Sequence, residues 1–98
     1  MKYDVYLLTP RTKRQYEKFD GHIRHKIKTE LLELEEEPDE KGNLLQELRA
    51  RLRYKRIFHA GVEYRAVYDI AKDKKEVLVM FIGSRENFYK ELKRFLHK

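Results

Sequence analysis

The side chains best suited to do chemistry in this sequence are cations and aromatic rings, all of them in its second half. They are Arg53, Lys55, Arg56, His59, Arg65, Arg85 and Tyr89. An arginine fork suits phosphate oxygens, and a lysine, histidine or tyrosine can transfer a proton when its pKa is shifted toward neutrality. RNA cleavage can use such a set without a metal, because the ribose 2′-hydroxyl is a nucleophile already tethered beside its phosphate. Alternatively, Arg65 is a structural partner of Asp69 or Glu63, and Tyr89 is a core residue.

Other common catalytic and metal-binding sets are missing from the sequence. Ser84 is the only serine, and without an evident histidine–aspartate pair it is better interpreted as a helix cap. His22 and His25 are three residues apart, but no third ligand with clear spacing accompanies them, so a surface helix is the favoured interpretation. There are no cysteines, which excludes a disulfide framework and a thiolate metal site. We therefore expect no cofactor and no metal.

Charge is distributed unevenly along the chain, which carries a net charge of +6. Residues 30–40 hold seven of its 17 acids, whereas Glu63 is the single acid between residues 49 and 65. The cations of that basic segment are Arg49, Arg51, Arg53, Lys55, Arg56 and Arg65. Such a patch is typical of a protein that binds a polyanion, although a solvated surface is the simpler alternative. If the polyanion is RNA, the expected binding residues outside the catalytic set are Arg49, Arg51, Arg53 and His59.

A hairpin forms the centre of the predicted fold. Its first strand, residues 62–70, alternates, so Tyr64 and Tyr68 face one side of the sheet and Arg65 faces the other. Its second strand, residues 77–82, is apolar at every position. A strand without a polar side is covered on both faces or lies centrally in its sheet. The hairpin therefore supplies the core and delivers Arg65 to a partly open face.

The remaining elements flank this hairpin. We predict a strand at 3–8, a helix at 10–19 capped by Thr9, a helix at 21–37 capped by Asp20, a helical turn at 44–48, a strand at 52–59 and a last helix from Ser84 to about 96. Arg56 interrupts the alternation of strand 52–59, which indicates a bulge there. This order predicts a single α+β domain over residues 1–98, with a mostly antiparallel four-stranded sheet and helices packed on one face. With no long apolar run or signal peptide, a cytoplasmic protein is expected.

Two motifs, found in this order of elements, resemble the RelE/ParE superfamily of toxin–antitoxin toxins. The strand sequence EYRAVYDI at 63–70 is similar to the YR-x-x-Y strand of that superfamily. The sequence FIGSR at 81–85, followed by Tyr89, is similar to its apolar strand ending in G-x-R. The resemblance extends over nearly the whole chain and implies a RelE-like toxin that a cognate antitoxin neutralises.

The resemblance also implies one of two activities. RelE-type members enter the ribosome and cut mRNA there, whereas ParE-type members inhibit DNA gyrase. Arg65 and Arg85 match arginines of the superfamily, Tyr89 falls near its tyrosine, and Lys55 and Arg56 lie in the neighbourhood of its RelE lysines. The resemblance therefore favours a ribosome-dependent, metal-independent mRNA endoribonuclease with these five residues as its catalytic set. A gyrase inhibitor without nuclease activity and an inactive relative that binds RNA or an antitoxin are the alternatives.

Overall fold

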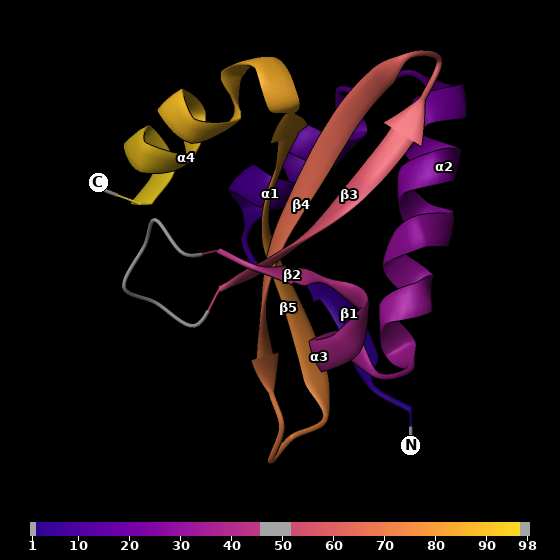
Figure 1. Ribbon diagram of the computed structural model, residues 1–98, viewed down its shortest axis with the longest axis vertical. Coiled ribbons are helices and arrows are strands. Elements are labelled where there is room, and N and C mark those ends of the chain that lie inside the picture. Colours follow the sequence, from indigo (N-terminus) through magenta and orange to yellow (C-terminus); the bar gives the residue numbers. More distant parts are fainter. Residues whose placement is uncertain (1, 46–51, 97–98) are drawn as a thin grey trace.

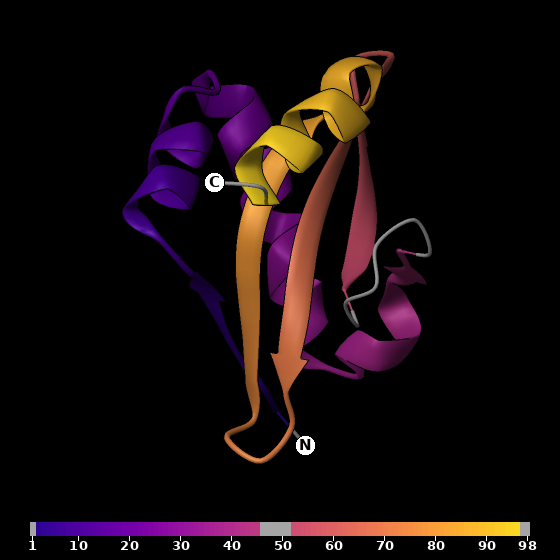
Figure 2. The same ribbon diagram turned by 90° about the vertical axis from the view of Figure 1, so that its left-hand side faces the viewer.

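One mixed sheet lies at the centre of the fold, and the helices pack against it (Figure 1). The computed structural model describes residues 2–45 and 52–96, the side chains of residues 87, 89, 95 and 96 excepted. The elements are β1 Asp4–Leu7, α1 Pro10–Glu17, α2 Gly21–Leu32, the 3₁₀ helix η1 Glu33–Glu35, α3 Pro38–Lys41, β2 Asn43–Leu44, β3 Arg53–His59, β4 Val62–Ala71, β5 Glu76–Ser84, the 3₁₀ helix η2 Arg85–Asn87 and α4 Phe88–Leu96. The β4–β5 hairpin is long, and its turn lies at the end of the molecule away from α4 (Figure 2).

The strands follow the order β1-β5-β4-β3-β2, and only the β1–β5 pair is parallel. The predicted α+β class with a mostly antiparallel sheet is confirmed. The sheet has one strand more than predicted, because the two-residue strand β2 pairs with the start of β3. The predicted helical turn at 44–48 is therefore wrong at Leu44, and its part from residue 46 on lies outside the described residues.

Helices cover both faces of the sheet, so the prediction that they all pack on one face is wrong. On one face, Ile27 and Leu31 of α2 pack against Tyr64 and Tyr68 of β4. On the other face, residues of α4 pack against residues of β4 and β5; this cluster includes Phe88, Leu92, Val67 and Phe81. We call these the α2 face and the α4 face. The central position of β5 between β1 and β4, with cover on both sides, agrees with its wholly apolar sequence.

Polar side chains begin the first two helices as predicted. The Thr9 hydroxyl accepts a hydrogen bond from the Thr12 amide, and the Asp20 carboxylate accepts from the amides of the first turn of α2. Helix α2, however, ends at Leu32 and not at residue 37. Proline disfavours a helical conformation in the residue before it, and Glu37, which precedes Pro38, has a left-handed conformation with φ of 50°.

A tight turn sets the register of the β3–β4 hairpin. Ala60 and Gly61 have positive φ angles of 50° and 77°, as a two-residue type I′ turn requires. His59 pairs with Val62, and pairing continues without a shift along β3. The bulge predicted near Arg56 is therefore wrong, and the irregularity lies between Val67 and Tyr68, where β4 pairs with β5.

Regular alternation divides β3 between the two faces. Lys55 and Ile57 pair with Ala66 and Tyr64, which belong to the core on the α2 face. Tyr54, Arg56 and Phe58 therefore point toward the α4 face. The apparent conflict in the sequence pattern arises because this face is only partly covered along β3, so a polar Arg56 is tolerated between two aromatic residues.

Gly42 offers a test of the packing between α3 and the sheet. A Cβ atom at this position would overlap the hydroxyl of Tyr68, which donates a 2.7 Å hydrogen bond to the Pro38 carbonyl. Burial raises the pKa of Tyr68 to about 12, so this hydroxyl stays protonated as a donor. We expect Gly42→Ala to lower the free energy of unfolding by about 1–3 kcal/mol, the usual cost of overpacking.

Urea denaturation measures this loss, and Gly21→Ala is the matched control. A Cβ at Gly21 would have no neighbour nearer than 3.9 Å, so this variant should match or slightly exceed the wild type in stability. Equal stability of Gly42→Ala and wild type would show that Tyr68 is free to move.

Candidate functional site

The α4 face presents two arginines directly opposite each other on neighbouring strands. Arg56 of β3 pairs in register with Arg65 of β4. Like charges in this arrangement repel, and Glu63 offsets the repulsion. Its Oε1 accepts a 3.0 Å hydrogen bond from Arg56, and its Oε2 accepts a 2.7 Å hydrogen bond from Nε of Arg65. We call Arg56, Glu63 and Arg65 the arginine cluster.

Arg65 is nearly enclosed within this cluster. Its guanidinium lies 4.8 Å from the ring centroid of Tyr54 and 5.2 Å from that of Phe88, the first residue of α4. Only 8% of the residue is exposed. The prediction that Arg65 faces away from α2 is confirmed, but the start of α4 covers it, so the face is not open at this point. Of its two candidate partners, Glu63 is the one it binds, whereas Asp69 accepts a hydrogen bond from the Ile70 amide.

Two other arginines of the α4 face are more accessible. The side chain of Arg56 is 46% exposed, with one edge held by Glu63. Arg85 follows β5 in η2, is exposed, and forms no ion pair within the described part of the chain. It lines an open pocket of about 630 Å³ at the end of the β3–β4 hairpin, which we call the hairpin-end pocket. The lining residues are Phe58, Gly61, Val62, Glu63, Ser84, Arg85 and Glu86.

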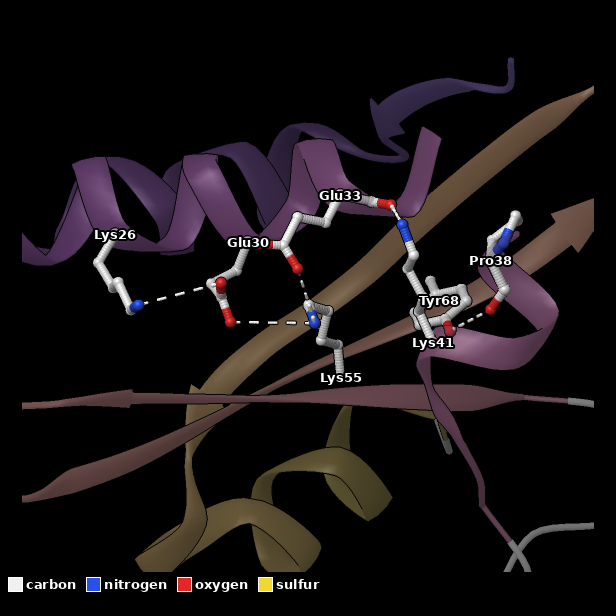
Figure 3. Close-up of polar contacts among 7 residues, drawn as sticks. All are labelled: Lys26, Glu30, Glu33, Pro38, Lys41, Lys55 and Tyr68. Atoms are coloured by element: carbon white, nitrogen blue, oxygen red, sulfur yellow. Dashed lines mark hydrogen bonds and ion pairs between the residues drawn. The ribbon is translucent and has the colours of Figure 1, made fainter. Parts of the chain in front are cut away.

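Lys55 points away from this group of arginines. Figure 3 shows it reaching from β3 toward α2, with α4 on the other side of the strands. Its Nζ lies 3.9 Å from a carboxylate oxygen of Glu30 and 3.6 Å from one of Glu33, and its side chain is only 12% exposed. The acids of α2 therefore hold Lys55 on the α2 face, and the structure does not bring it together with Arg56, Arg65 and Arg85.

The other predicted site residues are dispersed. His59 lines a pocket on the α2 side with His22 and His25, and Arg53 donates a 3.4 Å hydrogen bond to the Gly42 carbonyl. Tyr89 belongs to α4, but its side chain lies outside the described part of the structure, as do Arg49 and Arg51 entirely. Among residues 2–45 and 52–96, no group of histidines and carboxylates is arranged to hold a metal ion.

Ser84 lies at the N-cap position of η2, but its side chain makes no capping hydrogen bond. The last helix was predicted to begin directly after Ser84, whereas η2 comes first and α4 begins at Phe88. This 3₁₀ turn separates β5 from the helix that covers Arg65, and Arg85 is its first residue.

Opposing effects set the protonation of Glu63. Burial by itself raises the pKa of this carboxyl group, but hydrogen bonds and charge attraction from Arg56 and Arg65 outweigh it, so the pKa is lowered from its usual value. Glu63 is thus an anion at neutral pH. The sequence indicated Glu63 only as one possible partner of Arg65, and its bridge to Arg56 follows from the register that the Ala60–Gly61 turn sets.

Phe58 was missed as a candidate site residue. The bulge predicted near Arg56 would have broken the alternation that puts Phe58 and Arg56 on the same face. Strict alternation along the strand would have identified it, because side chains at every second position, here Tyr54, Arg56 and Phe58, lie on the same face of a sheet.

The arginine cluster predicts a specific dependence of stability on pH. At neutral pH, Glu63→Gln should lower the free energy of unfolding by about 1–3 kcal/mol, because two buried or half-buried guanidinium groups lose their anion. The pKa of Glu63 is below 4.5 in the folded state, so its contribution is complete above pH 4.5 and is lost as the pH falls through the folded value. The difference between variant and wild type should therefore shrink at acidic pH.

Urea denaturation at a series of pH values from 7 to 3 checks this result. Glu86→Gln is the control, because Glu86 is exposed in the same pocket and should show little difference at any pH. A Glu63→Gln deficit that stays constant over the whole pH range would contradict an ionic role.

Comparisons with known proteins agree with this architecture. The free RelE toxin of Escherichia coli, a mutant form, superposes with a TM-score of 0.72 at 24% identity, covering 96% of this chain and 98% of that one. The toxin–antitoxin complex RelBE2 of Mycobacterium tuberculosis gives 0.71 at 22% identity, with 87% and 100% covered. The intact RelBE complex of Escherichia coli gives 0.69 at 25% identity, with 83% and 94% covered.

Sequence comparisons give the family. No curated protein sequence matches the chain. No helix in the described part of the chain is both long and apolar enough to cross a membrane. The family model for the ParE-like toxin of type II bacterial toxin–antitoxin systems matches residues 6–93, which is most of the chain. The chain therefore belongs to the ParE-like toxins of the RelE/ParE superfamily, the toxin components of type II toxin–antitoxin systems.

Proposed function

We propose that this toxin is a ribosome-dependent mRNA endoribonuclease whose α4 face binds and cleaves RNA. The observation that carries the proposal is the convergence of Arg56 and Arg65 on one buried carboxylate, with Arg85 at the end of the neighbouring strand. Two guanidinium groups on one carboxylate, with a third arginine lining a pocket beside that carboxylate, suit a substrate that develops negative charge on a phosphate. Neither a metal nor a cofactor is part of the proposal.

The proposed reaction uses the RNA itself as nucleophile. The 2′-oxygen forms a bond to the adjacent phosphorus while the bond from phosphorus to the 5′-oxygen breaks, which yields a 2′,3′-cyclic phosphate and a free 5′-hydroxyl. A base removes the proton of the 2′-hydroxyl, and an acid returns a proton to the departing oxygen. Arg85 and Arg56 stabilise the phosphate charge, and Tyr89, carried by α4, is proposed to orient the nucleotide or transfer a proton.

Arg65 is proposed to act from beneath the other two arginines. Because Glu63, Tyr54 and Phe88 surround it, its charge reaches the phosphate mainly through the field of the cluster unless the start of α4 moves. Lys55 and His59, which face α2, are left out of this catalytic set. A cognate antitoxin is the proposed partner, since similar toxins have been crystallised in toxin–antitoxin complexes.

Removing Arg85 should abolish the block of translation. In a cell-free extract, wild type should stop protein synthesis and leave cuts in ribosome-bound mRNA, whereas Arg85→Ala should cut about 10²-fold more slowly, as after loss of an oxyanion-hole donor. Lys72→Ala is the control, because Lys72 is an exposed cation beyond the end of β4, paired with Asp39, and should leave cutting unchanged. Equal cutting by Arg85→Ala and wild type would exclude Arg85 from the reaction.

Neighbouring cations on opposite faces of β3 provide a second prediction. Arg56→Met should lower the rate of mRNA cutting by at least about 10-fold, because it removes a charge from the α4 face. Lys55→Met, which keeps the apolar stem next to α2, should change this rate less than about 3-fold. A larger loss for Lys55→Met than for Arg56→Met, with both variants folded by circular dichroism, would place the active face on the α2 side.

Inhibition of DNA gyrase is the second candidate function, favoured by the match to the ParE-like family model. A toxin of this kind acts by binding and needs no catalytic group. A supercoiling assay with purified gyrase separates the candidates, because only gyrase poisoning predicts accumulation of cleaved DNA. Cleaved DNA in that assay, with intact mRNA in the translation extract, would replace the nuclease proposal.

A further inference from the structure

Phe58 is an unusual surface residue. It is 58% exposed, the highest value among the large apolar residues that are exposed in the described part of the chain. Its aromatic neighbours on the α4 face, Tyr54 and Phe88, are by contrast engaged with Arg65. The Arg56 guanidinium lies over the Phe58 ring, 5.2 Å from its centroid, and so occupies one face of it, while the exposure of the residue leaves the rest of the ring accessible.

Phe58 and Val62 form an apolar side of the hairpin-end pocket, and Arg85 supplies positive charge. Two carboxylates also line the pocket, of which Glu63 is already paired with two arginines and Glu86 is exposed at the edge. A ligand that satisfies both features has a flat apolar part joined to an anionic part. A nucleotide has this composition, since its base can stack on an aromatic ring while its phosphate binds an arginine. The pocket volume of about 630 Å³ lies within the range typical of sites for small molecules.

We propose that the hairpin-end pocket is a nucleobase subsite in which an unpaired base stacks on Phe58. The phosphate attached to this base then lies toward Arg56 and Arg85. The inference rests on the proposed function in that it names a contact of the same RNA substrate, but stacking requires no cleavage. Base stacking on a protein ring contributes about 1–3 kcal/mol and is tolerant of sequence, because every base has a π face.

The backbone beneath Phe58 suits a rigid platform. Phe58 pairs with Glu63 one step from the type I′ turn at Ala60–Gly61, where the chain has little freedom. Glu63 is itself held by two arginines. A ring fixed in this way loses little conformational entropy when a base stacks on it, so more of the stacking energy is available for binding.

Binding of a non-cleavable oligonucleotide tests the proposal without depending on catalysis. The probe is a short single-stranded RNA whose ribose 2′-hydroxyls are methylated, labelled with a fluorophore and followed by anisotropy. We expect Phe58→Leu to weaken binding roughly 5- to 100-fold, which corresponds to the loss of one stacked base. Phe58→Tyr, which keeps the ring, should bind within about 2-fold of wild type.

A series of probes with one abasic site at successive positions assigns the contact to a base. An abasic site at one position should weaken binding by the wild type. The same abasic site should leave binding by Phe58→Leu unchanged, because this variant already lacks the ring on which that base stacks. Arg85→Ala should weaken binding to intact and abasic probes alike, since it removes a phosphate contact. Unchanged affinity of Phe58→Leu, or an equal loss with every abasic probe, would overturn the subsite.

Two further results distinguish the nucleobase subsite from the nuclease proposal and from a contact with the antitoxin. Base-dependent binding that requires Phe58, in a protein that cuts no mRNA, would support the subsite and reject the nuclease proposal. Normal oligonucleotide binding by Phe58→Leu, together with weakened binding of the purified antitoxin, would show that Phe58 contacts a protein and overturn the subsite. Because Phe58 is mostly exposed, we expect both Phe58→Leu and Phe58→Tyr to fold normally, and circular dichroism checks this.

Discussion

The ion pairing of Glu63 with Arg56 and Arg65 is the interaction on which the α4 face depends. Register places the two arginines opposite each other, and without an anion between them the strands would bring like charges together in a half-buried setting. Glu63 lies two residues before Arg65 on the same side of β4, so its carboxylate reaches both guanidinium groups. The face proposed to bind phosphates is thus held together by a carboxylate that remains ionised at neutral pH.

The same alternation along β3 that brings Arg56 into this cluster places Lys55 on the opposite face of the sheet. Lys55 and Arg56 are adjacent in the sequence and chemically similar, yet they point to opposite faces, where one meets the acids of α2 and the other meets Glu63. The acids of residues 30–40 therefore have a structural use, because Glu30 and Glu33 neutralise a lysine that lies mostly buried next to the core. Arg56, by contrast, stays on the α4 face with 46% of its side chain exposed, where solvent and ligands can reach it.

Much of the fold followed from periodicity and capping. The all-apolar strand at 77–82, the alternation around Arg65 and the caps at Thr9 and Asp20 each have one physical interpretation, and the structure agrees with them. The face that each β3 cation occupies did not follow, because it depends on a type I′ turn that uses Ala60, a residue without the usual preference for positive φ. The side of the sheet taken by α4 did not follow either, because it depends on the path of the chain through η2, a 3₁₀ turn that has no side-chain cap hydrogen bond.

The connection through η2 links two properties of the site. Arg85 lies at its start and Phe88, which covers Arg65, follows directly after its end, so one three-residue turn joins an exposed cation to the lid over a buried one. Because Phe88 is only three positions after Arg85, the cover over Arg65 and the exposed guanidinium of Arg85 are carried by the same short stretch of backbone.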